Sequence, residues 1–556
     1  MPKSSNQKNS FRFRTGIDLG SGVAELDNVQ DECFLFTDAY QAISDHENHL
    51  CVIVGKAGSG KSAIIRQLLL EKSNNIIRIH PQQLAFHFLR GSELLASLRQ
   101  TGINMSLFYK LLWRHVFIIE ILKHMFPEEV QLPGPFSGIL TKLHIKRRNK
   151  KRDLAFEYIE KWGHDFFQDT EHRIQEITNT LETDIRAEIK VSGTWPGLFG
   201  LSGAADGNRF SGQKIREHRE VAQKVVEQIQ ITHLYELFAW LKEDVLTDDQ
   251  NPCYIVIDDL DKPWVGAEVE HDLIAALLEE AMEFHQLANV KIVVALRDNI
   301  LHKVERNASP GKAVGQREKL ASQYLRLRWN TEELKSLLDL RIKFLIESTY
   351  TNDQAQVSDI FPKKQGKSSP SAIDYILERV TSRPRDAIKY LNLCIEAARG
   401  KVRISFRNIE DAEQPYSRER LEAAIDDWAD NYPELESVTR LLNGRPVRFS
   451  PTARSSDELL AVMVDQSDTA PWLRDITETY TKLLDSGEDQ ANSYAQRKFS
   501  EILYEVGIIG WVRGKGRTIN QMRFSFIDEP LLSASDFHGD PELVVHRAFR
   551  KELGVE

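Results

Sequence analysis

One glycine-rich segment of the sequence has residue types suited to binding phosphate. Residues 55–62 read Gly-Lys-Ala-Gly-Ser-Gly-Lys-Ser and match the pattern G-x-x-x-x-G-K-S. Glycines permit backbone torsions that side chains obstruct, so the amide groups of such a loop can surround phosphate oxygens. The residues expected to bind the nucleotide are Gly55, Lys56, Ala57, Gly58, Ser59, Gly60, Lys61, Ser62 and Ala63.

Two side chains of this segment carry further chemistry. We expect the Lys61 ammonium to bridge the β- and γ-phosphates and the Ser62 hydroxyl to bind Mg²⁺. ATP is expected rather than GTP, because the sequence lacks an Asn-Lys-x-Asp guanine motif. The expected cofactors are therefore ATP and Mg²⁺, and the expected reaction is hydrolysis of ATP to ADP and phosphate.

An acidic segment supplies the carboxylates that such a site needs. Residues 251–257 predict a buried strand, and Asp-Asp-Leu-Asp follows it directly at residues 258–261. We expect Asp258 to bind Mg²⁺, directly or through water, and Asp259 to position or deprotonate the attacking water. Asp261 would support either role. The alternative is an acidic turn that caps the following helix.

Polar residues also follow a third predicted strand, at residues 290–296. In an open parallel sheet, ligands bind at the carboxyl ends of the strands. Arg297 or Asn299 would then sense the γ-phosphate, and a salt-bridged surface turn is the alternative.

Two arginines flank a proline where another helix is predicted to begin, in the sequence Thr-Ser-Arg-Pro-Arg-Asp at residues 381–386. An arginine placed on the developing γ-phosphate charge can raise hydrolysis by about 10³ to 10⁵. Arg383 and Arg385 are both candidates, within one subunit or across a subunit boundary. The alternative is that Arg385 or Asp386 forms an ion pair within this helical region.

Predicted strands and helices must hold these residues together. Residues 51–54 predict a buried strand and residues 63–71 a helix, which are the elements that flank a phosphate-binding loop. Residues 76–79 predict the next strand. Because each βα unit takes about 30 residues, the distant acidic segment indicates a large insertion. The expected fold is an α/β P-loop NTPase with a parallel sheet.

The chain divides into four predicted regions. The ATPase core comprises residues 1–100 and 236–335, and a mainly helical insertion comprises 101–235. A helical lid follows at 336–400, and a C-terminal helical module at 401–556. In that module, a helix at 498–506, a basic glycine turn at 513–517 and a returning strand at 521–526 predict a winged-helix-like arrangement. Such a wing contacts either DNA or protein.

Composition excludes several other classes of protein. The chain has 556 residues, 41% of them hydrophobic, which is enough to bury several cores. No apolar stretch is long enough to span a membrane, so a cytoplasmic protein without membrane contact is expected. The four cysteines are widely separated and predict neither disulfides nor zinc. Net charge is −10, although the basic run at 146–152 leaves local nucleic-acid binding open.

Taken together, these motifs resemble those of a known family. The resemblance rests on residues 22–27, 55–62, 255–262, 296–298, 327–329 and 382–386, which occur in the order found in a bacterial P-loop ATPase family. That family is related to the KAP and STAND NTPases of the AAA-like ASCE division. The resemblance implies an ATP-dependent switch in an anti-phage cassette, acting on a nuclease or other toxin. Because the chain carries no recognisable effector or repeat sensor, a separate effector chain is the expected partner.

Three functions are consistent with the sequence. The first is an ATP-hydrolysing switch that changes its self-association, as a homo-oligomer, and controls a partner effector. The second is a loader or translocase whose ATPase activity is stimulated by nucleic acid. The third is a nucleotide-clamped scaffold with little turnover, in which Asp259 is not a base.

Overall fold

The structure is a computed structural model, and the chain divides into two compact units. The first unit comprises residues 1–36, 55–63 and 327–556, and the second comprises 37–54 and 64–326. The structure describes residues 12–84, 105–125, 238–246, 252–262, 264–287, 289–307, 319–349, 360–362, 370–451, 456–466, 470–512, 522–526 and 542–556. None of the described helices is both long and apolar enough to cross a membrane.

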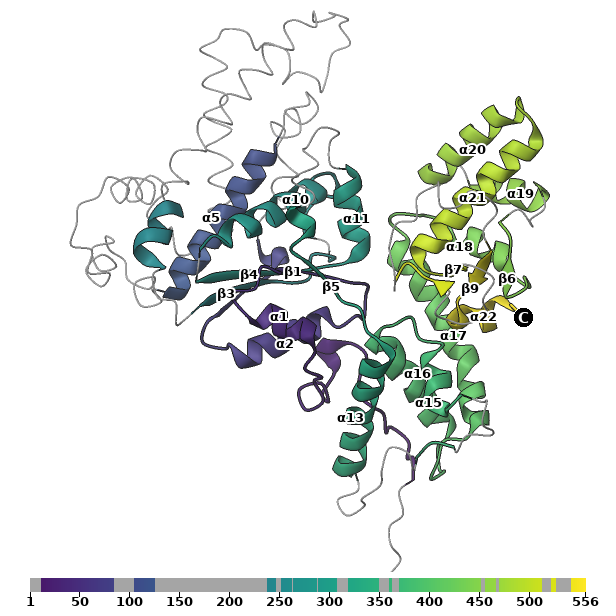
Figure 1. The fold of residues 1–556 in the computed structure, drawn as a ribbon, viewed down its shortest axis with the longest axis horizontal. Coiled ribbons are helices and arrows are strands. Elements are labelled where there is room, and N and C mark those ends of the chain that lie inside the picture. The colour runs from purple at the N-terminus through teal and green to yellow at the C-terminus, as the bar shows by residue number, and fades with distance from the viewer. Residues whose placement is uncertain are drawn as a thin grey trace, which may run out of the picture. The chain divides into compact units, whose positions relative to one another are not determined.

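A parallel sheet forms the centre of the second unit, which confirms the expected α/β fold (Figure 1). Its strands are β1 (Val52–Val54), β2 (Ile76–Ile79), β3 (Cys253–Ile257), β4 (Val290–Leu296) and β5 (Tyr324–Arg326). The strand order is β2-β3-β4-β1-β5, and every pairing is parallel. Each residue of β1, β3 and β4 is buried, as expected for strands covered on both faces.

The register of the sheet relates the ends of β1 and β3. Ile257, the last residue of β3, and Val52, the first residue of β1, both lie opposite Val294 in the intervening strand β4, and β1 continues to Val54, opposite Leu296. Because the strands are parallel, both have their carboxyl ends towards the same edge of the sheet, and β1 extends further towards it. The chain continues from β1 directly into Gly55, and from β3 directly into Asp258.

Helices cover both faces of this sheet. Helices α1 (Asp38–Ser44) and α2 (Lys61–Glu71) lie on one face, and α5 (Ser106–Met125), α10 (Ala267–Phe284) and α11 (Asp298–Asn307) lie on the other (Figure 1). Two short helical turns, η2 (Pro81–Gln83) and η3 (Leu241–Val245), also belong to this unit. Aromatic packing joins α5 to α10, where the rings of Phe117 and Phe284 meet edge to face.

Most of the predicted insertion lies outside the described residues. Within 101–235 the structure describes α5 and its preceding residue, which agree with the mainly helical insertion expected from the sequence. The basic run at 146–152 lies outside the described residues. So do residues 187–191, where the sequence pattern predicts a strand, the glycine-spaced segment at 193–212, and most of residues 215–246, where it predicts a helix.

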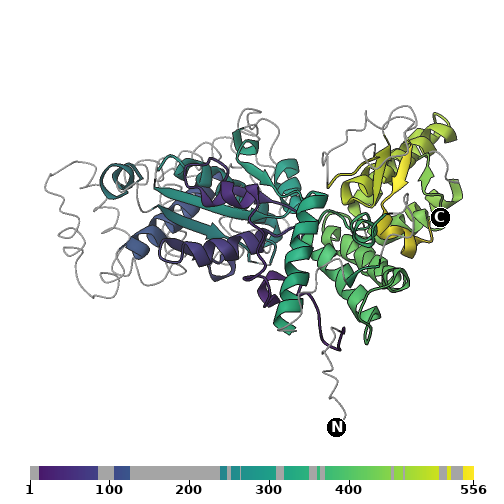
Figure 2. The same cartoon turned by 60° about the horizontal axis from the view of Figure 1, so that its bottom comes forward.

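Helices dominate the first unit (Figure 2). They are η1 (Ala24–Leu26), α13 (Thr331–Thr349), α15 (Ala372–Leu377), α16 (Pro384–Ala397), α17 (Phe406–Trp428), α18 (Leu435–Thr439), η4 (Arg440–Leu442), α19 (Ser456–Gln466), α20 (Pro471–Leu484), α21 (Glu488–Val506) and α22 (Arg547–Leu553). Local sequence sets several of their starts. Asn330 and Glu333 form a reciprocal cap at the start of α13, and Pro384 occupies the first turn of α16.

A small antiparallel sheet completes the C-terminal module. Its strands are β6 (Arg448–Phe449), β7 (Ile509–Val512), β8 (Met522–Arg523) and β9 (Leu543–Val545), in the order β6-β9-β7-β8. Helix α21 followed by the antiparallel pair β7 and β8 agrees with the expected winged-helix-like arrangement. The predicted basic turn between these two strands lies outside the described residues.

The N-terminal segment packs with the helices of the first unit. The buried Arg341 of α13 donates to the Leu19 carbonyl at 2.7 Å and to the Asp27 carboxylate at 2.6 Å. Asn392 of α16 accepts a hydrogen bond from the Leu19 amide and donates one to the Gly20 carbonyl. Residues 12–36 are thereby fixed against α13 and α16.

Candidate functional site

The backbone carbonyls of the glycine loop are engaged one after another. Lys61 Nζ donates to the carbonyls of Gly55 at 2.7 Å and of Lys56 at 3.0 Å. Arg383 Nη1 donates to the Ala57 carbonyl at 3.0 Å, the Arg385 amide to the Gly58 carbonyl at 3.3 Å, and Trp329 Nε1 to the Ser59 carbonyl at 2.8 Å. The negative ends of five consecutive peptide groups therefore face protein donors.

Two glycines give the loop its path. Gly58 and Gly60 have φ angles of +76° and +101°, a conformation that glycine adopts without steric cost. A Cβ built on Gly58 would lie 2.6 Å from Arg385 Cβ, and one built on Gly55 would lie 2.5 Å from Ser59 Oγ. The loop therefore needs glycine both for its torsions and for close packing.

This geometry fits a nucleotide phosphate. Helix α2 begins at Lys61, so the loop leads into a helix N-terminus, which favours anions. The Lys61 ammonium is held at the loop by two of the loop's own carbonyls. Ser62 lies in the first turn of α2, the position from which a hydroxyl would bind Mg²⁺.

The acidic segment of the second unit has an unusual backbone. Asp259 has a φ of +64°, a left-handed conformation that costs a non-glycine residue energy and that clusters at functional sites. Its carboxylate pairs with Lys262 Nζ at 2.8 Å, and its carbonyl accepts from Gln82 Nε2 at 3.1 Å. The buried Asp258 accepts from the Asp259 amide at 2.9 Å. Neighbouring contacts thus hold the strained backbone in place.

Arg297 forms an ion pair with Asp261 in this same unit. The contact joins the ends of β4 and β3, and it is the salt-bridged arrangement named above as the alternative to phosphate sensing. Asn299 accepts a hydrogen bond from the Ile300 amide at the start of α11. Contact of Arg297 or Asn299 with a phosphate stays a prediction.

Among the described residues, no cluster of three or more His, Cys, Asp or Glu residues could hold a metal ion. Mg²⁺ in a phosphate loop is held by one hydroxyl, one carboxylate and the phosphates themselves, so this finding leaves Ser62 and Asp258 as candidates. The four cysteines are all buried and free, as expected.

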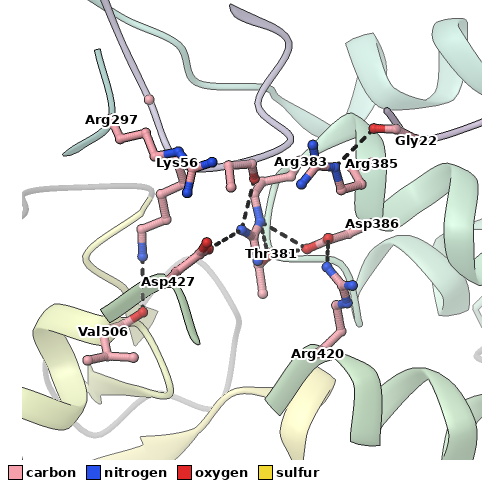
Figure 3. A network of polar contacts seen from close by, with 12 residues as sticks. Gly22, Lys56, Arg297, Thr381, Arg383, Arg385, Asp386, Arg420, Asp427 and Val506 are labelled. Carbon is pink, nitrogen blue, oxygen red and sulfur yellow. Dashed lines mark hydrogen bonds and ion pairs between the residues drawn. The ribbon is translucent and has the colours of Figure 1, made fainter. Parts of the chain in front are cut away.

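The two candidate arginines lie within the first unit and contact the glycine loop at its backbone carbonyls (Figure 3). Besides the Ala57 carbonyl, the buried Arg383 contacts Asp386 at 3.1 Å and Asp427 at 3.5 Å. Arg385 Nε donates to the Gly22 carbonyl at 2.9 Å. Both guanidinium groups are engaged with protein in this structure, and their action on a phosphate stays a prediction.

A buried ionic network surrounds Arg383. Asp386 is fully buried and accepts hydrogen bonds from Thr381, Arg383 and Arg420 (Figure 3). Burial raises the pKa of this carboxyl, but the charges of Arg383 and Arg420 outweigh it and hold the pKa below its ordinary value. Burial and the neighbouring Arg383 lower the pKa of Arg385. Arg383, which donates to the loop, therefore belongs to a buried group of side chains in which the arginine charges are paired with the charge of Asp386.

Sequence patterns did not identify three contributors to this site. Trp329 donates to the Ser59 carbonyl, Gly22 accepts from Arg385, and Arg420 pairs with Asp386. Lys56 was expected among the nucleotide-binding residues, but its ammonium donates to the Val506 carbonyl. Trp329 and Gly22 lie in segments that carried the family resemblance, although neither had an assigned role. Arg420 is buried within the long helix α17, whereas an arginine in such a helix is usually exposed.

Comparisons with known proteins agree with this arrangement. Residues 31–294 match the family described as the AAA ATPase domain, and residues 332–425 match the FunZ-associated C-terminal helical domain. The AAA match implies ATP binding and hydrolysis. With the parallel sheet and the glycine loop, it makes the fold an AAA-type P-loop fold with a large insertion, a C-terminal helical domain and a small antiparallel sheet.

Solved structures with overall similarity include a Walker-type ATPase of Pyrococcus abyssi, at 11% identity and a TM-score of 0.34 over 89% of this chain and 94% of that chain. Cdc6p from Pyrobaculum aerophilum has 12% identity and a TM-score of 0.27, over 90% and 88% of the two chains. At these TM-scores neither similarity supports a conclusion about fold or function. No curated protein matches the chain.

Proposed function

We propose that this protein is an ATP-hydrolysing switch that controls a separate effector protein in bacterial anti-phage defence. One observation carries the proposal: the carbonyls of Ala57 and Gly58 in the glycine loop are bonded to Arg383 and Arg385 at the start of α16. A change in loop geometry on nucleotide binding would act directly on the helices that follow. A ligand shifts such an equilibrium through its different affinity for the two states.

Two further observations support this proposal. The motif segments between residues 22 and 386 named in the sequence analysis resemble a family related to KAP and STAND NTPases, in which ATP-dependent switching is expected. Residues 332–425, which include Arg383 and Arg385, match a domain described as FunZ-associated. That description supports a second component beside the ATPase, and a toxin or nuclease is the effector we propose.

The residues present can be assigned roles in hydrolysis. Lys61 would hold the β- and γ-phosphates, while Ser62 and Asp258 would hold Mg²⁺, which neutralises charge on the phosphates when bound. The strands β1 and β3 are parallel and have their carboxyl ends towards the same edge of the sheet, which supports this pairing of segments. Asp259 would position or deprotonate the attacking water. Its left-handed backbone and its ion pair with Lys262 fix the direction of the carboxylate.

Asp259→Asn tests the switch. We expect the variant to keep ATP bound, to lose most turnover and to remain in the ATP-bound assembly state. Phosphate release and mass distributions, each measured with and without ATP, give the two readouts. Asp272→Asn, in α10, is a matched control that should behave as wild type.

Other results would contradict the proposal. If Asp259→Asn changed neither turnover nor assembly, a nucleotide-clamped scaffold would be the better account. If turnover rose with DNA or RNA and this effect weakened steeply with salt, a nucleic-acid-stimulated ATPase would be favoured.

A further inference from the structure

The C-terminal end of α21 is closed by four separate donors. The last four carbonyls of a helix lack partners inside the helix and must be satisfied from elsewhere. In α21, the Ile508 amide donates to Leu503 at 3.0 Å and the Gly507 amide to Tyr504 at 2.9 Å. Ser525 Oγ donates to the Glu505 carbonyl at 3.1 Å. These three donors all come from the C-terminal module itself.

The fourth donor comes from the glycine loop. Lys56 Nζ donates to the Val506 carbonyl at 3.1 Å, across 450 residues of sequence (Figure 3). The same ammonium lies 5.5 Å from the centre of the Phe526 ring. A cation at a helix C-terminus interacts favourably with the helix dipole, and a cation near an aromatic ring gains further attraction. The Val506 carbonyl and the Phe526 ring therefore both stabilise the positive charge of the Lys56 ammonium.

Lys56 lies within the glycine loop, but this contact directs its side chain to another part of the molecule. Its carbonyl accepts from Lys61 Nζ, the group expected to hold the phosphates. Its ammonium caps α21. One residue thus touches both the phosphate-binding lysine and the end of a helix in the C-terminal module.

We propose that Lys56 is a positioning residue that couples the nucleotide state of the glycine loop to the C-terminal module at residues 401–556. The inference rests on the proposed function and names the route by which that site would be regulated. Coupling between two sites is reciprocal, so a contact that transmits the effect of nucleotide to α21 also lets a partner bound to the module alter nucleotide affinity.

The contact lies at a partly exposed position. Lys56 is half-buried, and a small hollow of about 10 Å³, enough for about one water molecule, lies beside it, lined by residues that include Arg383, Asp427 and Phe526. Gly507 keeps this space, because a Cβ built on it would lie 3.0 Å from both Lys56 Nζ and Phe526 Cδ1. Water can therefore replace the Val506 carbonyl as a partner of the Lys56 ammonium when the contact opens.

Hydrogen exchange of the full-length protein tests the contact, first without nucleotide. We expect Lys56→Met and Phe526→Leu to raise exchange at residues 503–512 by about three- to tenfold, as loss of a capping cation and its ring contact predicts. Lys498→Met is the matched control, because Lys498 lies on α21 but contacts Glu501 on the same helix. If Lys56→Met raised exchange no more than Lys498→Met, the proposal would be wrong.

Saturating Mg-ATP then tests the coupling. In wild type, ATP should change exchange at 503–512 by at least about twofold, an effect that Lys56→Met should abolish. Phe526→Leu should weaken this effect of ATP without abolishing it. An equal change in wild type and Lys56→Met, or no change in a wild type that binds ATP, would overturn the proposal. If wild type bound no ATP, the proposed function would fail, and the nucleotide-free comparison would still decide the contact.

Discussion

Arg385 lies directly against Gly58. Its amide donates to the Gly58 carbonyl at 3.3 Å, and its Cβ lies 2.6 Å from where a Cβ of residue 58 would be. The phosphate loop and the start of α16 are therefore packed backbone to backbone, with no room for a side chain between them.

Replacing this glycine should damage nucleotide binding. Gly58→Ala introduces both a strained left-handed torsion and a collision with Arg385, so we expect at least a tenfold loss of ATP affinity, equal to about 1.4 kcal/mol. Gly400→Ala is the matched control, because Gly400 has a φ of +79° and nothing within 4 Å of a built Cβ. It should lower stability by about 1–2 kcal/mol without changing ATP affinity. Equal affinity in the two variants would contradict the packing argument.

Trp329 should affect ATP binding through its hydrogen bond to the Ser59 carbonyl of the loop. Trp329→Phe keeps an aromatic ring beside Gly60 and removes the N–H that donates to the Ser59 carbonyl. We expect ATP affinity to fall severalfold, since an unsatisfied buried carbonyl costs about 1–3 kcal/mol. Titration calorimetry gives the affinity, and thermal denaturation gives the stability.

Trp472→Phe controls for the loss of an indole donor. Trp472 Nε1 donates to the Pro433 carbonyl at 2.8 Å within the C-terminal module. That variant should lose stability and keep its ATP affinity. If both tryptophan variants lost affinity equally, the effect of Trp329 would be general destabilisation and not a local one.

Much of the sheet could be predicted from sequence because its central strands β3 and β4 are buried on both faces and consist mainly of apolar residues. The observed bounds of β4 match those predicted, 290–296, and so do those of β2, 76–79, although Arg78 in β2 is exposed. The glycine loop could also be predicted from sequence, because its pattern requires particular backbone torsions and a strand and a helix on either side. The end of the edge strand is less clear from sequence: Leu325, Leu327 and Trp329 alternate as in a strand, but β5 ends at Arg326 and the Trp329 indole donates to the glycine loop.

Contacts between distant side chains could not be predicted. Nothing in the loop pattern constrains the residue at position 56, so the contact from Lys56 to Val506 had no local signal. An ion pair formed by Arg385 or Asp386 was one expectation, and Asp386 does form one, but its partners, Arg383 and Arg420 from the next helix, could not be named. The packing of residues 12–36 against α13 and α16 likewise depends on tertiary contacts with Arg341 and Asn392.

The C-terminal module should weaken in acid through His546. This buried imidazole caps α22 by accepting from the Ala548 amide, and burial lowers its pKa from 6.5 to about 3. Because the unfolded state binds the proton more readily, the stability this group contributes is full above pH 6.5 and is lost as pH falls towards 3.

His546→Asn separates this titration from the cap. Asparagine is a good N-cap but does not titrate here, so the variant should lose about 2 kcal/mol less stability than wild type between pH 7 and pH 5. Chemical denaturation at both values measures the difference. The same loss in both proteins would show that His546 is not the group responsible.

Titration of Mg-ATP into wild type and Lys61→Ala, monitored by calorimetry, tests the central claim most directly. The claim is that residues 55–62 bind the phosphates of ATP, with the Lys61 ammonium among them. We expect wild type to bind and Lys61→Ala to lose more than about tenfold in affinity, or about 1.4 kcal/mol, with an unchanged circular dichroism spectrum. Lys72→Ala, just beyond the end of α2, should bind as wild type does. Unaltered ATP affinity in a folded Lys61→Ala variant would contradict the account.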